Sequence, residues 1–375
     1  MRVTLSPLSL LCSLVGPLLA AGLATPVAAQ QGSGEPDRAE RVEESLEVED
    51  SFDYLPTSNT IVSKLPTDQV WTPANIGAVD SVLIEEQNGQ VLGDALSNLS
   101  GINVQTGSGV FDFFVLRGFD SLSSALVLTD GVPEPESTFY QLYNVERVEI
   151  FKGPAGFLYG SNPLAGVVNL VRKQPLPHGL ASFGIGWGSF HTTEASFDLN
   201  AASAEGRTSF RLNGLWRESD GYRDGRDYSV SAIHPVFAWR PNERKALTVS
   251  LELSSSDYRP DAGLPLLAGV LPDVPRERSY ASPLDQSRQD IVRIQVDYEV
   301  VINERFTVRN KLYSRELDWD TRGTLISGVL DFGTGPQVLR VLLDLDDRQS
   351  LLGNQLELLW RTDRHQLLAG LELMR

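Results

Sequence analysis

Cysteine is almost absent from this chain: among 375 residues there is only Cys12, which lies inside an apolar N-terminal stretch. Beyond that stretch the chain has no thiol, which excludes disulfides and cysteine metal sites. Histidine is also scarce, and no two of the four histidines stand four residues apart, as a helical metal pair requires. We therefore expect no metal and no cofactor.

Other absences exclude further classes of function. The sequence contains no Gly-x-Ser-x-Gly nucleophile elbow and no phosphate-binding loop, so no enzyme is expected. The formal net charge is -17, and no run of lysine and arginine forms the basic patch that a nucleic-acid-binding protein uses. After the N-terminus, no apolar stretch approaches the ~20 residues that a spanning helix needs.

The first 29 residues have the features of a cleaved signal peptide. Arg2 supplies the positive start, Leu8–Leu23 is mostly apolar, and Val27-Ala28-Ala29 offers small residues for cleavage. The mature chain would then begin near Gln30. A buried helix or an uncleaved anchor is the alternative, which the length and the flanking residues disfavour.

Residues 30–64 are polar and acidic and are interpreted as a flexible tether. Within them, Glu44-Ser45-Leu46-Glu47-Val48 alternates in polarity. Such a segment can add as a strand to the sheet edge of a partner, although an ordinary stretch of linker is the alternative.

Residues 65–175 change to a mixed α/β pattern. We expect a strand at Ile76–Val79, a short helix capped by Asp80 or Ser81, and a second helix from Val91 to Leu99 that ends at Gly101. Further strands are expected at Ile102–Gln105, Phe111–Leu116, Ala125–Thr129, Val145–Phe151 and Val167–Val171. Frequent glycines between these short runs indicate tight turns. The pattern predicts an α+β domain.

Residues 176–375 alternate between apolar and polar positions, most clearly from Val292 to Val300. Short connections near 204–206, 241–243, 302–304 and 362–364 separate longer ones at 218–227, 257–289 and 318–336. A soluble sandwich shows the same period of two. Strict alternation of short and long connections is typical of an antiparallel transmembrane β-barrel, which this chain would contain incompletely.

Several motifs resemble one known family in order and spacing. They are Leu92–Val104, Val115–Phe119, Leu128–Pro133, Val145–Pro154, Leu158–Ser161 and Gly166–Val171. Together they are similar to the plug domain of TonB-dependent outer-membrane receptors. This resemblance implies a plug domain at 65–175 in front of a barrel in the cell outer membrane, surrounded by its lipid.

The resemblance also implies partners. The family's coupling segment, the TonB box, precedes the plug and binds a TonB-type energy-transducing protein, and Glu44 to Val48 occupies that position. Its sequence departs from the usual run, which tends to carry Thr or further Val. The runs Arg259–Pro265 and Val274–Arg278 resemble the third outer loop of ferric-siderophore receptors, which implies a ferric siderophore as ligand. Cobalamin, another metal chelate and a small sugar stay open.

Two groups of site residues follow. By position, the plug apex that contacts ligand would include Thr106, Gly107, Glu134, Phe139 and Tyr140. A second group carries charge in or beside apolar strands and is expected to be structural, pairing within the plug or with the barrel wall. Its members are Arg117, Arg147, Glu149 and Lys152.

The number of strands raises a question about the chain itself. Receptors of this resemblance close with about 22 strands, whereas we count roughly nine by their alternation. An open sheet leaves unpaired backbone groups in lipid, each costing several kcal/mol. We therefore expect either a truncated sequence, or a broken gene giving a remnant that does not transport, or a second piece that completes the barrel.

Overall fold

The structure is a computed structural model that describes residues 58–59, 61, 64, 67–68, 72, 74–107, 111–121, 125–135, 139–160, 165–267, 269–331, 333 and 335–375. Within these residues, no helix has the length and apolar character needed to cross a membrane. The expected signal peptide and the segment Glu44–Val48 lie outside the described residues and remain predictions.

The plug region contains three small sheets. The largest has the order β3 (Ile76–Asp80), β9 (Val145–Phe151), β10 (Gly166–Arg172), β7 (Ala125–Thr129) and β8 (Val132–Pro133). In it, β10 and β7 are parallel and the other neighbours are antiparallel. The others are β4 (Ile102–Gly107), β5 (Phe111–Leu116) and β6 (Phe119–Asp120), and the pair β1 (Ser58–Asn59) and β2 (Thr67–Asp68).

Three short helices complete this region: α2 (Ser81–Glu86), α3 (Leu92–Leu96) and α5 (Gly156–Tyr159). Asp80 caps α2 as expected, because its carboxylate accepts the Val82 N–H at 3.2 Å. The prediction that the second helix reaches Leu99 was wrong. Ser97 Oγ donates to the Gly93 carbonyl at 2.8 Å, and Asn98 likewise bonds back to the preceding turn. Such side-chain bonds compete with helix continuation.

The plug sheets enclose an apolar core of their own. Its fully buried members include Val79, Leu96, Leu116, Val148 and Ile150. Gly166 lies where β10 passes close to β9: a Cβ there would be 2.3 Å from the Phe151 carbonyl oxygen. Any side chain at this position would force the two strands apart, which explains one of the glycines between the apolar runs.

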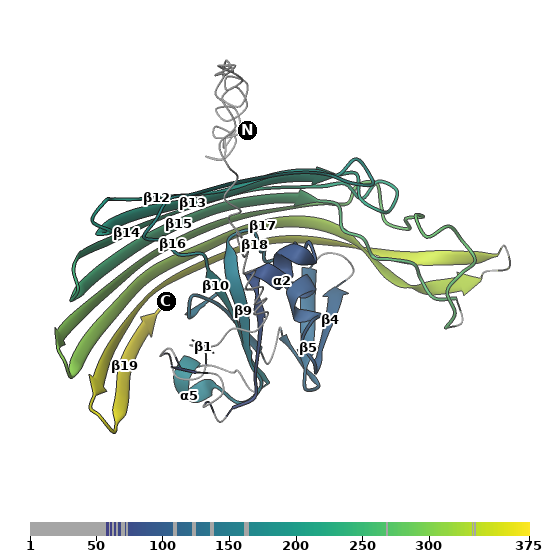
Figure 1. Cartoon of the computed structure of the whole chain (residues 1–375). Helices are drawn as coiled ribbons and strands as arrows, with labels where there is room; N and C mark the ends of the chain where they lie inside the picture. The colour runs from purple at the N-terminus through teal and green to yellow at the C-terminus, as the bar shows by residue number, and fades with distance from the viewer. Residues whose placement is uncertain are drawn as a thin grey trace, which may run out of the picture. The chain divides into compact units, whose positions relative to one another are not determined.

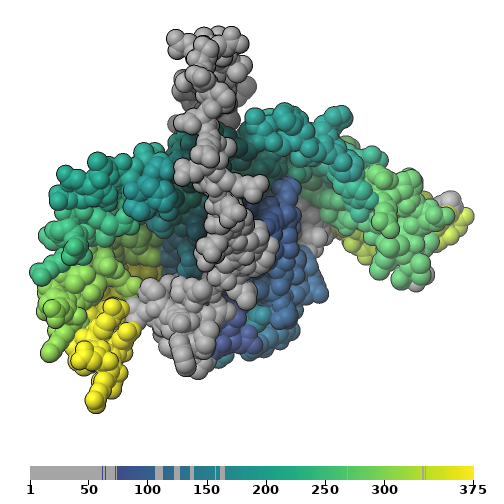
Figure 2. Space-filling view, in the orientation of Figure 1, coloured from purple at the N-terminus to yellow at the C-terminus, as the bar shows by residue number. Residues whose placement is uncertain are grey.

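Nine strands form the second part of the structure, each antiparallel to the next in chain order. They are β11 (Leu180–Trp187), β12 (Thr193–Ala202), β13 (Thr208–Ser219), β14 (Tyr228–Asn242), β15 (Lys245–Tyr258), β16 (Gln286–Asn303), β17 (Phe306–Asp331), β18 (Pro336–Arg361) and β19 (Gln366–Met374). Figure 1 shows them as one curved sheet, and in Figure 2 the sheet (teal to yellow) flanks the plug strands (blue). The α+β region followed by antiparallel strands is the predicted order.

The predicted connections are present at all but one place, although the link at 188–192 between β11 and β12 is short and lies at the end of the long connections. Residues 203–207, 243–244, 304–305 and 362–365 form short links at one end of the sheet, and residues 220–227 and 259–285 form long connections at the other. The expected long connection at 318–336 was wrong. There β17 continues to Asp331 and pairs with β18 as a ribbon. Its polar residues pair across the ribbon, as Arg322 does with Asp344 at 2.9 Å.

The two faces of this sheet differ in chemistry. The outward face carries the apolar residues, with exposed aromatic side chains toward the short links (Trp239, Tyr298, Phe306) and toward the opposite end (Trp187, Trp216). Aromatic girdles at both edges of an apolar band are characteristic of outer-membrane barrels. The inward face carries polar register partners, which are Ser182, Asp198, Asn213 and His234 on β11–β14 and Glu252, Arg293 and Arg315 on β15–β17.

Candidate functional site

A buried carboxylate joins the plug to the inward face of the large sheet. Glu134 follows β8 directly, and its two carboxylate oxygens contact Arg293 Nε on β16 at 2.7 Å and Arg315 Nε on β17 at 3.2 Å. The Glu134 side chain has no exposed surface, and those of Arg293 and Arg315 are 6% and 1% exposed. Gln295 holds the far side of Arg315 by accepting from Nη2 at 2.6 Å.

Further ion pairs extend this contact along the sheet. Arg172, at the end of β10, pairs with Glu252 on β15, which also lies 3.3 Å from Arg293 Nη1. Lys173 Nζ lies 3.5 Å from Asp198 on β12. Opposite charges therefore alternate between plug and sheet. Breaking a buried pair of this kind by removing one partner typically costs about 3–5 kcal/mol, because the other charge is left uncompensated.

The two acidic plug residues in this contact respond to it in opposite directions. Burial alone would raise the pKa of Glu134, but the charges of Arg293, Arg315 and Arg172 outweigh it and hold that pKa below its usual value. Burial raises the pKa of the Asp130 carboxyl, although Arg172 and Lys311 oppose the shift. Glu134 is thus ionised in this contact, whereas burial disfavours the charged form of Asp130.

Glu134 was expected at the ligand-contacting apex. In the structure its carboxylate contacts two arginines of the sheet, and its role toward a ligand stays a prediction. No local signal could have found these partners, since Arg293 and Arg315 follow Glu134 by 159 and 181 residues.

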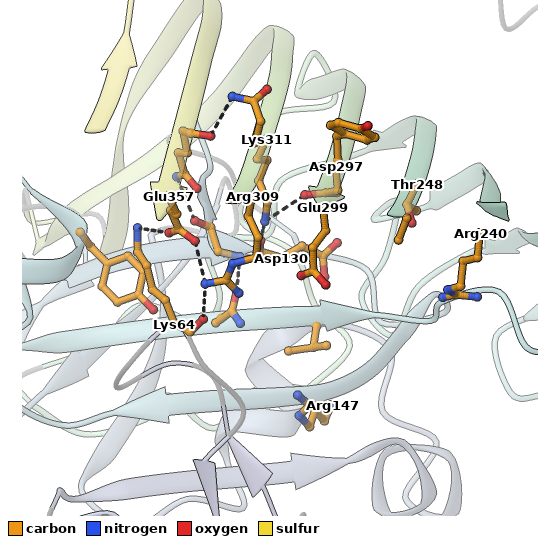
Figure 3. A pocket seen from close by; sticks show the side chains of 18 residues that line it. Lys64, Asp130, Arg147, Arg240, Thr248, Asp297, Glu299, Arg309, Lys311 and Glu357 are labelled. Carbon is orange, nitrogen blue, oxygen red and sulfur yellow. Dashed lines mark hydrogen bonds and ion pairs between the residues drawn. The ribbon is translucent and has the colours of Figure 1, made fainter. Parts of the chain in front are cut away.

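A polar cavity of about 500 Å³ separates the plug from β14–β18 (Figure 3). Glu357 on β18 lies at one end of it, 3.3 Å from Lys64 Nζ and 2.8 Å from Arg309 Nη2. Lys311 donates to the Asp130 carbonyl and lies 3.5 Å from Asp297. Acidic and basic side chains nearly balance in this cavity, so it is lined for water and polar groups.

The charged residues that were expected to be structural lie mainly within the plug. Arg147 Nε contacts the fully buried Glu149 at 2.8 Å on β9. Lys152 Nζ donates to the Ser100 carbonyl at 2.5 Å, and both burial and the positive charge of Arg117 lower its pKa. Arg117 itself is exposed in the turn between β5 and β6 with φ 51°. The structural role of these four residues stays a prediction.

The other expected apex residues divide into two places. Thr106 and Gly107 end β4. Phe139 packs edge-on against Tyr258 of β15 with ring centroids 5.2 Å apart, and Tyr140 Oη donates to the Pro135 carbonyl at 3.2 Å. The contact of Phe139 places it near the end of the sheet where the long connections begin.

Sequence reasoning missed Tyr258, the sheet residue that Phe139 contacts. Tyr228 and Tyr258 are register partners on the inward face, and Ser287 continues their row. Trp319 Nε1 donates to Ser287 Oγ at 3.1 Å. The available signal was an inward aromatic residue at the same end of successive strands. Phe139, Tyr258 and its register partner Tyr228 bring three aromatic rings to this end of the inward face; we call these three side chains the aromatic wall, on which a planar ligand can stack.

No cluster of three or more histidine, cysteine or acidic side chains suited to a metal ion occurs in the described part of the chain.

Comparison with known proteins gives a family match to the plug region. Residues 68–167 match the TonB-dependent Receptor Plug Domain. The chain is 26% identical over 260 residues to the ferrichrome outer membrane transporter/phage receptor of Escherichia coli K12, covering 64% of this chain and 34% of that protein. It is 30% identical over 237 residues to the metal-pseudopaline receptor CntO of Pseudomonas aeruginosa, covering 62% and 33%. The match thus spans about a third of these relatives.

Solved structures show the same fold. The ferric-catecholate import receptor Fiu of E. coli K12 superposes with a TM-score of 0.77 at 22% identity, covering 86% of this chain and 49% of that one. The ferripyoverdine receptor of P. aeruginosa, solved with ferripyoverdine, gives 0.76 at 19% identity, covering 87% and 45%. The plug and the nine strands therefore have the arrangement seen in these receptors.

Proposed function

We propose that this chain is part of a TonB-dependent outer-membrane receptor, by its plug domain and by the antiparallel sheet that follows it, and that the whole receptor imports a ferric siderophore. The observation that carries the proposal is the plug held by buried ion pairs to the polar inward face of a sheet whose outward face is apolar. Such a sheet separates lipid from a plugged polar interior, which is the arrangement of a gated importer.

The aromatic wall is where ligand capture would begin. Phe139, Tyr228 and Tyr258 lie on the inward side at the end with the long connections, which in such barrels faces the outside. Aromatic faces suit the flat chelating groups of a catecholate or hydroxamate. Names of similar proteins, such as the ferrichrome transporter and the ferrioxamine receptor of Yersinia enterocolitica, agree with a siderophore.

Release of the ligand inward requires the plug to move. The proposed route runs from the tether: a TonB-type partner pairs with Glu44–Val48 by strand addition and pulls on the plug. The plug–sheet contact is suited to reversible opening because it consists of ion pairs, whose groups water can solvate when they separate. The cavity beside Lys64 and Glu357 provides polar space between the plug and the sheet.

Uptake by cells tests this function. The complete receptor is expressed in cells without other siderophore receptors, and entry of ⁵⁵Fe carried by ferrichrome, ferrioxamine or a catecholate is followed. Deleting Glu44–Val48 should abolish uptake and leave surface binding intact, whereas deleting residues 31–35 of the same tether should change neither. Uptake that survives the first deletion would remove the coupling segment from the proposal. If cobalamin or a sugar competes for uptake and a siderophore does not, that compound becomes the proposed ligand.

A further inference from the structure

A buried ion pair ties together three segments at the end of the large sheet with the long connections. Arg226 lies in the connection between β13 and β14, and its Nη1 is 3.3 Å from the carboxylate of Asp285, which ends the connection between β15 and β16. Thr324, on the ribbon of β17 and β18, donates its hydroxyl to the same carboxylate at 2.9 Å. These three residues are 7%, 1% and 2% exposed. We call them the loop clasp.

Arg226 also closes the base of the longer connection, residues 259–285. Its guanidinium donates to the Pro260 carbonyl at 2.6 Å and to the Ser282 carbonyl at 3.1 Å. These carbonyls lie near the two ends of that connection, so one side chain holds both ends together. The Ser282 N–H in turn donates to Asp285 at 3.2 Å. Fixing both ends of a loop at one point removes much of its conformational freedom.

The shorter connection, residues 220–227, is shaped to present Arg226. Gly221 has φ 77°, and a Cβ there would lie 2.1 Å from the Arg226 carbonyl oxygen, so this turn requires glycine. Arg223 in the same turn pairs with Asp261 of the longer connection at 2.7 Å. The two connections therefore meet at a second point beside the loop clasp. Figure 1 shows both connections and the ribbon at the same end of the sheet.

The loop clasp lies directly beyond the aromatic wall. Tyr228 follows Arg226 by two residues, and Tyr258, its register partner, precedes Pro260 by two. Two residues of extended chain span about 7 Å. The rings of Tyr228 and Tyr258 are thus carried by the strand ends that the loop clasp holds together. A change in the spacing of the connections would move these rings apart.

The chemistry of the loop clasp favours a fixed geometry. A buried ion pair adds little net stability compared with well-packed apolar side chains, because both charges lose their water. The planar guanidinium of Arg226 instead fixes direction, since its donors reach a carboxylate and two carbonyls at once. Such a contact specifies one arrangement of the three segments.

We propose that Arg226 and Asp285 are positioning residues of the ligand-capture site. The loop clasp holds the two connections and the ribbon as a preformed rim, so the aromatic wall has its binding arrangement before a ligand arrives. Both residues are too buried to contact a ligand and act through Tyr228 and Tyr258. A preformed site avoids the cost of ordering loops on binding. The inference rests on the proposed function, because it assumes a ligand that enters at this end.

Asp285→Ala in the complete receptor tests the inference. Arg226 is left without its carboxylate, and the connections separate to let water reach the buried charge. Hydrogen exchange of peptides covering 220–227 and 276–286 should become about tenfold faster, because these segments open more often. Binding of ferrichrome, ferrioxamine and a ferric catecholate is followed by stopped flow. Only the receptor fraction with a formed rim can bind, so association should slow about tenfold while dissociation keeps its rate.

Asp227→Ala is the matched control, because it removes a carboxylate from the same connection. Asp227 pairs with Arg259 at 2.8 Å, but the two side chains are 56% and 41% exposed. This variant should change neither hydrogen exchange nor association. Thr324→Val removes only the hydroxyl of the loop clasp and should slow association less than Asp285→Ala does. It provides the same test if Asp285→Ala does not assemble.

Three results would overturn the inference. They are unchanged hydrogen exchange in Asp285→Ala, faster exchange with unchanged association, and equal effects of Asp285→Ala and Asp227→Ala. Faster dissociation with unchanged association would also contradict it, because that result indicates a lost contact with the ligand. A parent receptor that binds cobalamin but none of the three chelates would defeat the proposed function. The same two rates measured with cobalamin would then still decide this inference.

Discussion

The plug and the nine-stranded sheet place their apolar residues on opposite sides. The plug closes its own core around residues such as Leu116 and Val148, which are fully buried. The sheet instead exposes Leu, Ile and aromatic side chains outward and turns Glu252, Arg293 and Arg315 inward. One part encloses its apolar side chains in a core, and the other exposes them on its outward face. Some apolar contacts join the two parts, such as Phe139 on Tyr258, but buried ion pairs form a large part of the contact between them.

This difference predicts that the largest loss of stability comes from breaking the buried ion pairs between the plug and the sheet. Glu134→Ala in the complete receptor leaves Arg315 buried without its carboxylate and weakens the neutralisation of Arg293. We expect a loss of about 3–5 kcal/mol in the free energy that holds the plug to the sheet. Faster hydrogen exchange and proteolysis of β7–β10 in the folded barrel would report it.

Glu85→Ala is the matched control, because this plug carboxylate also faces a lysine, Lys173 at 3.4 Å, but is 69% exposed. Screening by solvent should keep its effect below about 1 kcal/mol. Equal effects of the two substitutions would contradict the view that burial gives the Glu134 contact its strength.

A smaller effect should separate the two faces of one strand. Val249 and Thr248 are neighbours on β15, the first outward among apolar residues and the second lining the polar cavity. Val249→Arg puts a charge into lipid and should cost about 2–4 kcal/mol of barrel stability, whereas Thr248→Arg should be nearly neutral beside Asp297. Urea unfolding in lipid vesicles measures both. A more harmful change at Thr248 would reverse our assignment of the faces.

The smallest effect concerns pH and should have opposite signs at two plug carboxyls. The pKa of Glu134 is lowered on folding, so its contribution is present above its unfolded pKa and lost as pH falls through the folded value. The pKa of Asp130 is raised, so its contribution is present at low pH and lost as pH rises through the folded value.

Asp130→Asn keeps the acceptor for the Arg172 N–H but removes the cost of the buried charge. We expect this variant to melt higher than the parent at pH 7 and to lose that advantage near pH 4. Glu134→Gln should melt lower than the parent at pH 7. Calorimetry of both variants at pH 7 and pH 4 checks these predictions. Melting temperatures that shift in the same direction for both variants at pH 7 would contradict the environments proposed for the two carboxyls.

The sequence predicted most of the elements because their signals are local. Alternation located the barrel strands, and glycine-bounded apolar runs located those of the plug. Prediction from the sequence failed where one local pattern is compatible with two structures. The polar stretch 318–336 reads as a loop, but its residues find partners across a ribbon, and the helix after Val91 stops early because Ser97 and Asn98 bond back to the turn before them.

The site was less predictable than the fold because its residues meet only after folding. Phe139 was expected near the ligand, but Tyr258 and Trp319 had no motif to mark them. Glu134 was expected at the plug apex by its position, but its two arginine partners on distant strands could not be predicted. The sequence shows that a residue carries charge. Its role depends on its partners, which are set by the strands that lie opposite it in the folded protein.

The sequence separation of these contacts has a consequence for the order of assembly. Every neighbour in the large sheet is also the next strand in the chain, so hairpins can close one after another without waiting for distant strands. The pairs of Glu134 with Arg293 and Arg315 bridge 159 and 181 residues, and they need β16 and β17 already in register. A strand slipped by one residue would turn these arginines toward lipid. We therefore expect the plug to dock only after these strands have paired. Its docking then depends on the correct register of the sheet.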